Sequence, residues 1–116
     1  MELIALLSTG QGTWAQVAGL IKQGQWDRII LVGDNYAKEF AVGKEVEFIT
    51  VDIGASLKEL KEEFSERLKP KISGLEVALS IASGTGKEHM ALISALIDMP
   101  VGIKFTALTK DGIVFF

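Results

Sequence analysis

The chain contains no cysteine and only one histidine among its 116 residues. The absence of cysteine excludes disulfides, thiolate metal sites and cysteine nucleophiles. The single histidine, His89, has no second histidine and no suitably spaced carboxylate pair with which it could form a metal site. We therefore expect neither a metal nor a resident cofactor.

Arginine and long apolar runs are also scarce. The chain has twelve basic residues, of which two are arginine, and fifteen acidic residues, so the net charge is −3. No stripe of Lys and Arg is present to displace phosphate counterions, so direct binding to duplex nucleic acid is not expected. The apolar residues 1–7 lack a basic leader and are too short to span a bilayer. These absences predict a cytoplasmic protein that does not bind membranes.

The length and the hydrophobic content of 48% predict one globular domain over residues 1–116. Apolar strand patterns alternate with helical ones, which favours an α/β fold, a Rossmann-like three-layer sandwich with a mainly parallel sheet in the order 3-2-1-4-5 and a C-terminal β-hairpin. The strands are expected at residues 2–7, 28–33, 46–51, 75–82, 101–108 and 113–116, with an Asp-Gly turn before the last. The helices are expected at residues 14–22, 36–42, 57–69 and 88–98.

Two glycine-rich turns each follow a strand and precede a helix. The first is Ser8-Thr9-Gly10-Gln11-Gly12-Thr13, and the second is Ser83-Gly84-Thr85-Gly86-Lys87. The strands before them are predicted neighbours where the strand order reverses, so both turns would open onto one crevice. The candidate ligand-binding residues are Thr9, Gly10, Gln11, Gly12, Thr13, Ser83, Gly84, Thr85, Gly86 and His89.

The first turn has two interpretations. Gly10, Gly12 and Ala15 match a dinucleotide fingerprint, and Asp34, at the end of the second strand, would then bond a ribose hydroxyl. Three observations weaken this match. Ser8 and Thr9 separate the strand from the first glycine, and the bulky Trp14 lies where the pyrophosphate would come close. The chain is also too short to include a substrate domain. The alternative is a plain turn that needs the backbone freedom of glycine.

The second turn is not a Walker A motif, because its spacing is wrong and Glu88 follows Lys87. Outward-facing N–H groups, a helix N-terminus and the Lys87 ammonium would instead suit a small anion. The alternative is a turn with Lys87 in solvent. His89 has either a structural role or one in acid-base chemistry.

The order of elements, together with Ser83-Gly84-Thr85-Gly86-Lys87-Glu88-His89-Met90, resembles the CARF (CRISPR-associated Rossmann fold) domains. In that family the later motif reads close to Thr-Gly-Gly-Thr-Lys-x-Met. Here the middle Gly and Thr are exchanged, and the methionine lies one place further along. The likeness spans nearly the whole chain, but only the two turns are diagnostic.

This resemblance implies a stand-alone homodimer that binds a cyclic oligoadenylate across its two-fold axis in CRISPR-type antiviral defence. It assigns catalysis in ring-cleaving members to Ser8 or Thr9 and to Lys87, in a metal-free attack of a ribose 2′-hydroxyl on its own phosphate. No winged-helix or HEPN effector follows, so a sensor, a regulator or a ring nuclease is expected. The apolar residues 88–98 also favour a second subunit. The competing expectation is a small nucleotide- or dinucleotide-binding module, or a non-catalytic assembly subunit.

Overall fold

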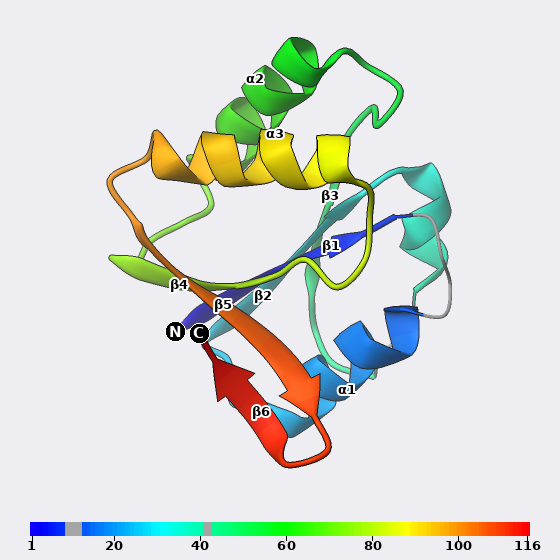
Figure 1. Cartoon of the computed structure of the whole chain (residues 1–116), viewed down its shortest axis with the longest axis vertical. Helices are drawn as coiled ribbons and strands as arrows, with labels where there is room; N and C mark the ends of the chain where they lie inside the picture. The colour runs from blue at the N-terminus through cyan, green and yellow to red at the C-terminus, as the bar shows by residue number, and fades with distance from the viewer. Residues whose placement is uncertain (9–12, 41–42) are drawn as a thin grey trace.

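The computed structural model describes residues 1–8, 13–40 and 43–116 (Figure 1). The strands are β1 (Glu2–Leu7), β2 (Arg28–Gly33), β3 (Glu47–Thr50), β4 (Glu76–Ser80), β5 (Gly102–Thr109) and β6 (Gly112–Phe115). The helices are α1 (Trp14–Gln23), the 3₁₀ helix η2 (Asn35–Glu39), α2 (Leu57–Leu68) and α3 (Gly86–Ile97).

The strands form one sheet in the order β3-β2-β1-β4-β5-β6. All neighbours from β3 to β5 pair in parallel, and β5 and β6 form an antiparallel hairpin. This confirms the predicted strand order and the predicted hairpin. The central pair is β1 with β4, in which Glu2 lies opposite Val77 and Ala5 opposite Ser80.

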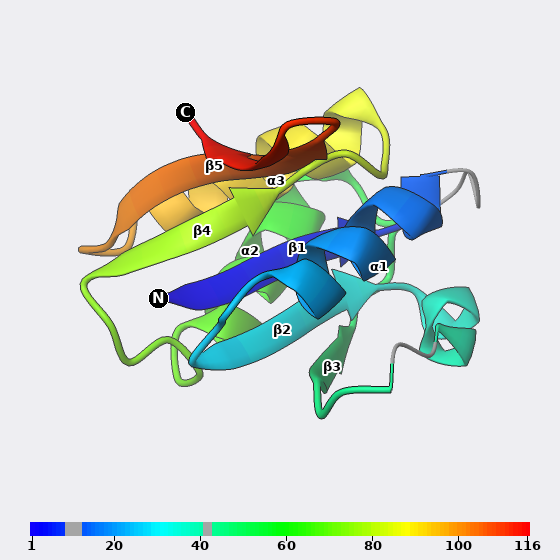
Figure 2. The same ribbon diagram turned by 90° about the horizontal axis from the view of Figure 1, so that it is seen from below.

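The sheet is the middle of three layers. Helix α1 covers one face, and α2 and α3 lie side by side on the other (Figures 1 and 2). Every residue of β1 is buried, and its side chains alternate between the two faces: Leu3, Ala5 and Leu7 pack in the α1 layer, Ile4 and Leu6 in the α2–α3 layer. A continuous apolar run is what a strand covered on both faces requires.

Three local predictions need correction. The predicted helix at 36–42 is a 3₁₀ helix that begins at Asn35, because the Asp34 carboxylate caps it by accepting from the Ala37 N–H. Helix α3 begins two residues earlier than predicted, after its cap at Thr85. The hairpin turn lies one residue earlier than the predicted Asp-Gly turn: residues 110–111 form it, and Gly112 begins β6 with a φ of +107°. Within the described ranges, no helix is both long enough and apolar enough to cross a bilayer.

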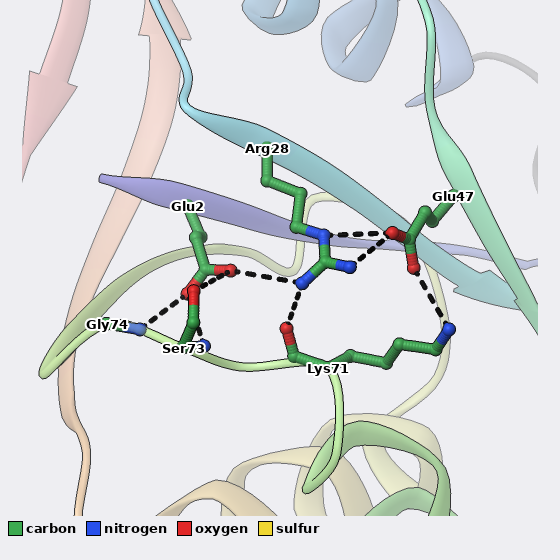
Figure 3. A network of polar contacts seen from close by, with 6 residues as sticks. All are labelled: Glu2, Arg28, Glu47, Lys71, Ser73 and Gly74. Atoms are coloured by element: carbon green, nitrogen blue, oxygen red, sulfur yellow. Dashed lines mark hydrogen bonds and ion pairs between the residues drawn. The ribbon is translucent and has the colours of Figure 1, made fainter.

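A polar network joins the amino ends of the central strands (Figure 3). Glu2 is 4% exposed, and its carboxylate accepts from the backbone N–H groups of Ser73 and Gly74 at 3.1 and 3.0 Å. Arg28 lies 3.7 Å from the same carboxylate and also donates to the Lys71 carbonyl. These contacts hold the loop between α2 and β4 against the amino ends of β1 and β2.

The outer part of this network predicts a pH dependence of stability. Arg28 Nε donates to Glu47 Oε1 at 2.9 Å, and this hydrogen bond lowers the pKa of Glu47 below its ordinary value of 4.5. A carboxyl whose pKa is lower in the folded chain stabilises the fold above its unfolded pKa, and this contribution is lost as pH falls through the folded pKa. Glu47→Gln should therefore destabilise the protein well above pH 4.5 and lose this effect well below it.

Denaturant unfolding of the wild-type protein and the variant, once well above and once well below pH 4.5, measures the difference in their free energies of unfolding. The exposed Glu45 is the matched control, since it makes no ion pair among the described residues. An equal effect of Glu47→Gln at both pH values, or an equal effect of Glu45→Gln, would contradict the assignment.

Candidate functional site

Ser8, where the first predicted turn begins, and the second predicted turn lie at the carboxyl edge of the sheet. Ser8 directly follows β1, and Ser83 lies three residues after β4, which pairs with β1. In Figure 2 strands β1, β2 and β4 all run from left to right, toward the side on which η2 and the start of α3 lie. This is the edge at which open α/β sheets bind ligands, where the strand order reverses.

Ser8 joins the two turns by hydrogen bonds. Its N–H donates to Ser83 Oγ at 3.0 Å, and its hydroxyl donates to Glu88 Oε2 at 2.9 Å. Its carbonyl accepts from Trp14 Nε1 at 3.0 Å, which fixes the start of α1. Ser8 is 4% exposed and Ser83 is 1% exposed. Ser8, the first residue of the first turn, therefore contacts both the second turn and the start of α3, and it is buried.

Glu88 is a site residue that sequence reasoning missed. It is 2% exposed, and its Oε1 accepts from the Thr85 N–H at 2.9 Å while its own N–H donates to Thr85 Oγ1 at 3.3 Å. This reciprocal pair is a capping box, which the Thr-x-x-Glu spacing could have revealed. No basic side chain of the described residues forms an ion pair with the carboxylate. Its charge is stabilised instead by the hydrogen bonds donated to it and by the positive end of α3.

The two glycines of the second turn have different surroundings. Gly84 has a φ of +105°, and a Cβ there would lie 2.5 Å from Leu6 Cδ2, so both conformation and packing require glycine. At Gly86, the first residue of α3, a Cβ would meet no heavy atom of the described residues within 4 Å, and the backbone needs no unusual φ. The backbone of Gly86 is therefore open to approach from solvent.

The capping box leaves two donors at the start of α3. Thr85 and Glu88 satisfy each other's N–H groups, whereas the N–H groups of Gly86 and Lys87 take part in no hydrogen bond among the described residues. Such donors, at the positive end of a helix, suit an anion. The Lys87 ammonium lies nearby but donates to the Ala55 carbonyl at 2.8 Å, in the loop between β3 and α2.

His89 lies against the same turn. Its Nε2 is 2.8 Å from the Ser83 carbonyl oxygen. A carbonyl can only accept, so Nε2 carries the hydrogen atom in this contact. The side chain therefore supports the bend between β4 and α3, and a role in acid-base chemistry stays a prediction.

The first turn lies mostly outside the described residues. Thr9, Gly10, Gln11 and Gly12 are not among them. Thr13 is the N-cap residue of α1, and its side chain makes no capping hydrogen bond. Over the described ranges, no three His, Cys, Asp or Glu side chains are grouped so that they could hold a metal ion.

The comparisons with known proteins bear on the fold. Neither a protein-family model nor a curated protein sequence matches the chain. Among solved structures, the crystal structure of protein VC1899 from Vibrio cholerae is similar, with a TM-score of 0.67 and 13% sequence identity. The likeness covers 98% of this chain and 33% of that one, so this chain spans about a third of that protein's length. At this identity the likeness shows a shared α/β fold.

The two glycines should respond differently to alanine. Gly84→Ala should lower the free energy of unfolding by about 1–3 kcal/mol, because alanine is strained at this φ and contacts Leu6. Gly86→Ala should leave it unchanged or raise it by less than about 1 kcal/mol, because alanine favours helix and meets nothing. Denaturant unfolding of both variants measures this, and equal losses would show that Gly86 also has a structural role.

Proposed function

We propose that this chain binds a phosphate of a small nucleotide at the start of α3. The observation that carries the proposal is the pair of N–H groups of Gly86 and Lys87, which are unbonded among the described residues and lie beside the junction of β1 and β4. A helix N-terminus offers positive potential as well as donors, and the exposed Lys87 ammonium adds a positive charge. Glycine at position 86 lets a phosphate oxygen approach the backbone without a side chain in the way.

The nucleotide we propose is a cyclic oligoadenylate, bound by a CARF-like homodimer in antiviral defence. This identity comes from the resemblance of residues 83–90 to the CARF motif. A cyclic ligand with two-fold symmetry suits an isologous interface, because each subunit then offers the same start of α3 to an equivalent phosphate. The ligand-binding roles of the two turns belong to this proposal.

Sensing without cleavage is the form of this function that the geometry favours. The Ser8 hydroxyl is buried and donates its hydrogen atom to Glu88, so it would have to leave that contact to donate to a phosphate. Lys87 can reach a ligand more readily, because its bond to the Ala55 carbonyl is at the surface. Ring cleavage by Ser8 and Lys87, which the resemblance implies, stays a prediction.

A dinucleotide or mononucleotide is the alternative ligand. Asp34 lies at the carboxyl end of β2, next to β1, where a dinucleotide-binding fold places the acid that bonds ribose. One of its carboxylate oxygens caps η2, and the other accepts no hydrogen bond from the residues that the structure describes. NAD and AMP are therefore necessary comparison ligands.

Removing the charge of Lys87 should weaken ligand binding without unfolding the protein. If Lys87 makes a charge-assisted contact with a phosphate, Lys87→Ala should raise the Kd for cyclic tetra- or hexa-adenylate roughly ten- to hundredfold. Lys110→Ala, in the exposed hairpin turn, makes the same charge change away from the site and should have no effect. Calorimetric titration with both rings, NAD and AMP measures this.

The pattern of binding decides between the candidate functions. Tight NAD binding without binding of either ring would favour the dinucleotide module, and no binding of any ligand would favour an assembly subunit. Linear products in the same mixtures would establish cleavage. In that case Ser8→Ala should reduce turnover more than binding, because only contacts that strengthen in the transition state speed a reaction.

Helix α3 is the surface that we propose for the second subunit. Its residues Met90 and Ile97, which lie two turns apart on one side of the helix, are 58% and 66% exposed. Beside Met90 lies a hollow of about 410 Å³ between α2 and α3, lined by Leu57 and Ala91 and also by Lys58, Lys61 and Ser94. Large apolar side chains exposed together on one helix are typical of interaction surfaces.

Charges on this surface should therefore prevent association. We expect the wild-type protein to be a dimer and the double variant Met90→Lys with Ile97→Lys to be a monomer, because an isologous interface would bury four added ammonium groups. Leu75→Lys is the control, since Leu75 is 87% exposed and lies outside α3, directly before β4. Light scattering at tens of micromolar measures the mass, and a monomeric wild-type protein would refute the dimer.

A further inference from the structure

Strand β6 lies at one end of the sheet, and among the described strands it pairs only with β5 (Figure 1). The Phe116 N–H, directly after the strand, donates to the Phe105 carbonyl of β5 at 2.8 Å. Backbone groups alternate in direction along a strand, so Val114 also faces β5, whereas Ile113 and Phe115 face away from it. The free edge of β6 therefore presents the N–H and C=O groups of two residues.

The two end strands of the sheet differ in how they are protected. Exposed edges are usually guarded by charged side chains, proline or a covering group. In β3, Glu47 carries a charge, and the Arg67 guanidinium donates to the Thr50 carbonyl at 3.0 Å. Strand β6 reads Gly-Ile-Val-Phe, with neither a charge nor a proline. In the described part of the chain, no other group bonds the outward backbone of Ile113 and Phe115.

The side chains of β6 are apolar on both faces of the sheet. Ile113 packs against the α1 layer, and the Phe115 ring lies 6.2 Å from the Trp26 ring on the same face. Val114, between them in sequence, points to the opposite face. The Phe115 side chain is 50% exposed although its ring contacts Trp26. A strand added at the free edge would therefore meet apolar side chains on both faces.

A second copy of β6 is complementary to this edge about a two-fold axis at Val114. In that antiparallel pairing, Ile113 of each copy lies opposite Phe115 of the other, and the outward groups of each such pair exchange two hydrogen bonds. Four backbone hydrogen bonds result. The pairs of an aromatic with a β-branched side chain are favourable across strands. Because β6 carries no charge, the pairing brings no like charges together.

We propose that the free edge of β6 is a self-association surface, at which two copies of the chain join their sheets into one. It shares no residue with the α3 surface proposed above, and it needs no ligand. A strand of four residues is only about 13 Å long. The interface is therefore smaller than the roughly 1,200 Å² that stable complexes bury, and the association is weak. It joins chains at concentrations well above those at which the α3 surface is expected to act.

The variant Met90→Lys with Ile97→Lys isolates this surface, because it removes the one proposed on α3. Sedimentation equilibrium should show a monomer at tens of micromolar and a growing dimer fraction toward about one millimolar, as expected for a small interface. The wild-type protein should exceed the mass of a dimer over the same range. Amide hydrogen exchange of Ile113 and Phe115 should slow as concentration rises, whereas that of Val114, which already faces β5, should change little.

Two substitutions in this double variant block the edge in different ways. Phe115→Pro removes an outward N–H and should raise the Kd of the dimer at least about tenfold. Phe115→Ala, which loses the same ring but keeps the N–H, should raise it less than about fivefold. Val114→Lys keeps every N–H but brings two ammonium groups together at the two-fold axis, and it should abolish the dimer. Leu75→Lys adds the same charge outside β6 and should have no effect.

The outcomes separate this inference from the proposed function. A double variant that stays monomeric at one millimolar, or equal effects of Phe115→Pro and Phe115→Ala, would overturn the inference and leave the α3 surface standing. Dimerisation of the double variant already at tens of micromolar, abolished by Val114→Lys, would support the inference and refute the α3 surface. A chain that does not self-associate through β6 but binds a synthetic peptide of alternating valine and threonine there would overturn it, since the edge would then receive a segment of another protein.

Discussion

The contact between Ser8 and Glu88 is the constraint on which the candidate site depends. It joins the end of β1 to the first turn of α3, 80 residues later in the chain, and it is buried. The Ser8 N–H makes a second bond to Ser83 Oγ, so the end of β1 is tied to the second turn at two places. These bonds fix the position of Ser8 relative to the start of α3.

The same contact explains how a carboxylate can be buried beside a site proposed for an anion. Glu88 uses both oxygens, one for the Ser8 hydroxyl and one for the Thr85 N–H, and it lies in the first turn of a helix where negative charge is favourable. By satisfying Thr85, it leaves only Gly86 and Lys87 with outward donors in the described first turn of α3. The capping box therefore selects which N–H groups a ligand can reach.

The strands and their order could be predicted from the sequence, because they depend on local apolar patterns and on the handedness of crossovers. The bounds of β1 and β2 agree with the predicted residues 2–7 and 28–33. The start of α3 was placed too late, because the Thr85 cap marks the boundary and the apolar run begins only after it. A capping box is a local signal and could have been found.

The burial of Ser8 could not be predicted in the same way, since its partner Glu88 comes from a distant segment. The contact of the Lys87 ammonium with the Ala55 carbonyl could not be predicted either, because Ala55 also belongs to a distant segment.

The two edges of the sheet have separate roles. At the amino edge, Glu2, Arg28 and Glu47 join the strands to the loop before β4, and these contacts involve no residue of the candidate site. At the carboxyl edge, the N–H groups of Gly86 and Lys87 and one carboxylate oxygen of Asp34 form no hydrogen bond with any described residue. A hydrogen-bond donor and an acceptor held at separate places on one edge of a sheet favour a single orientation for any ligand that carries both an anionic group and hydroxyl or amino groups.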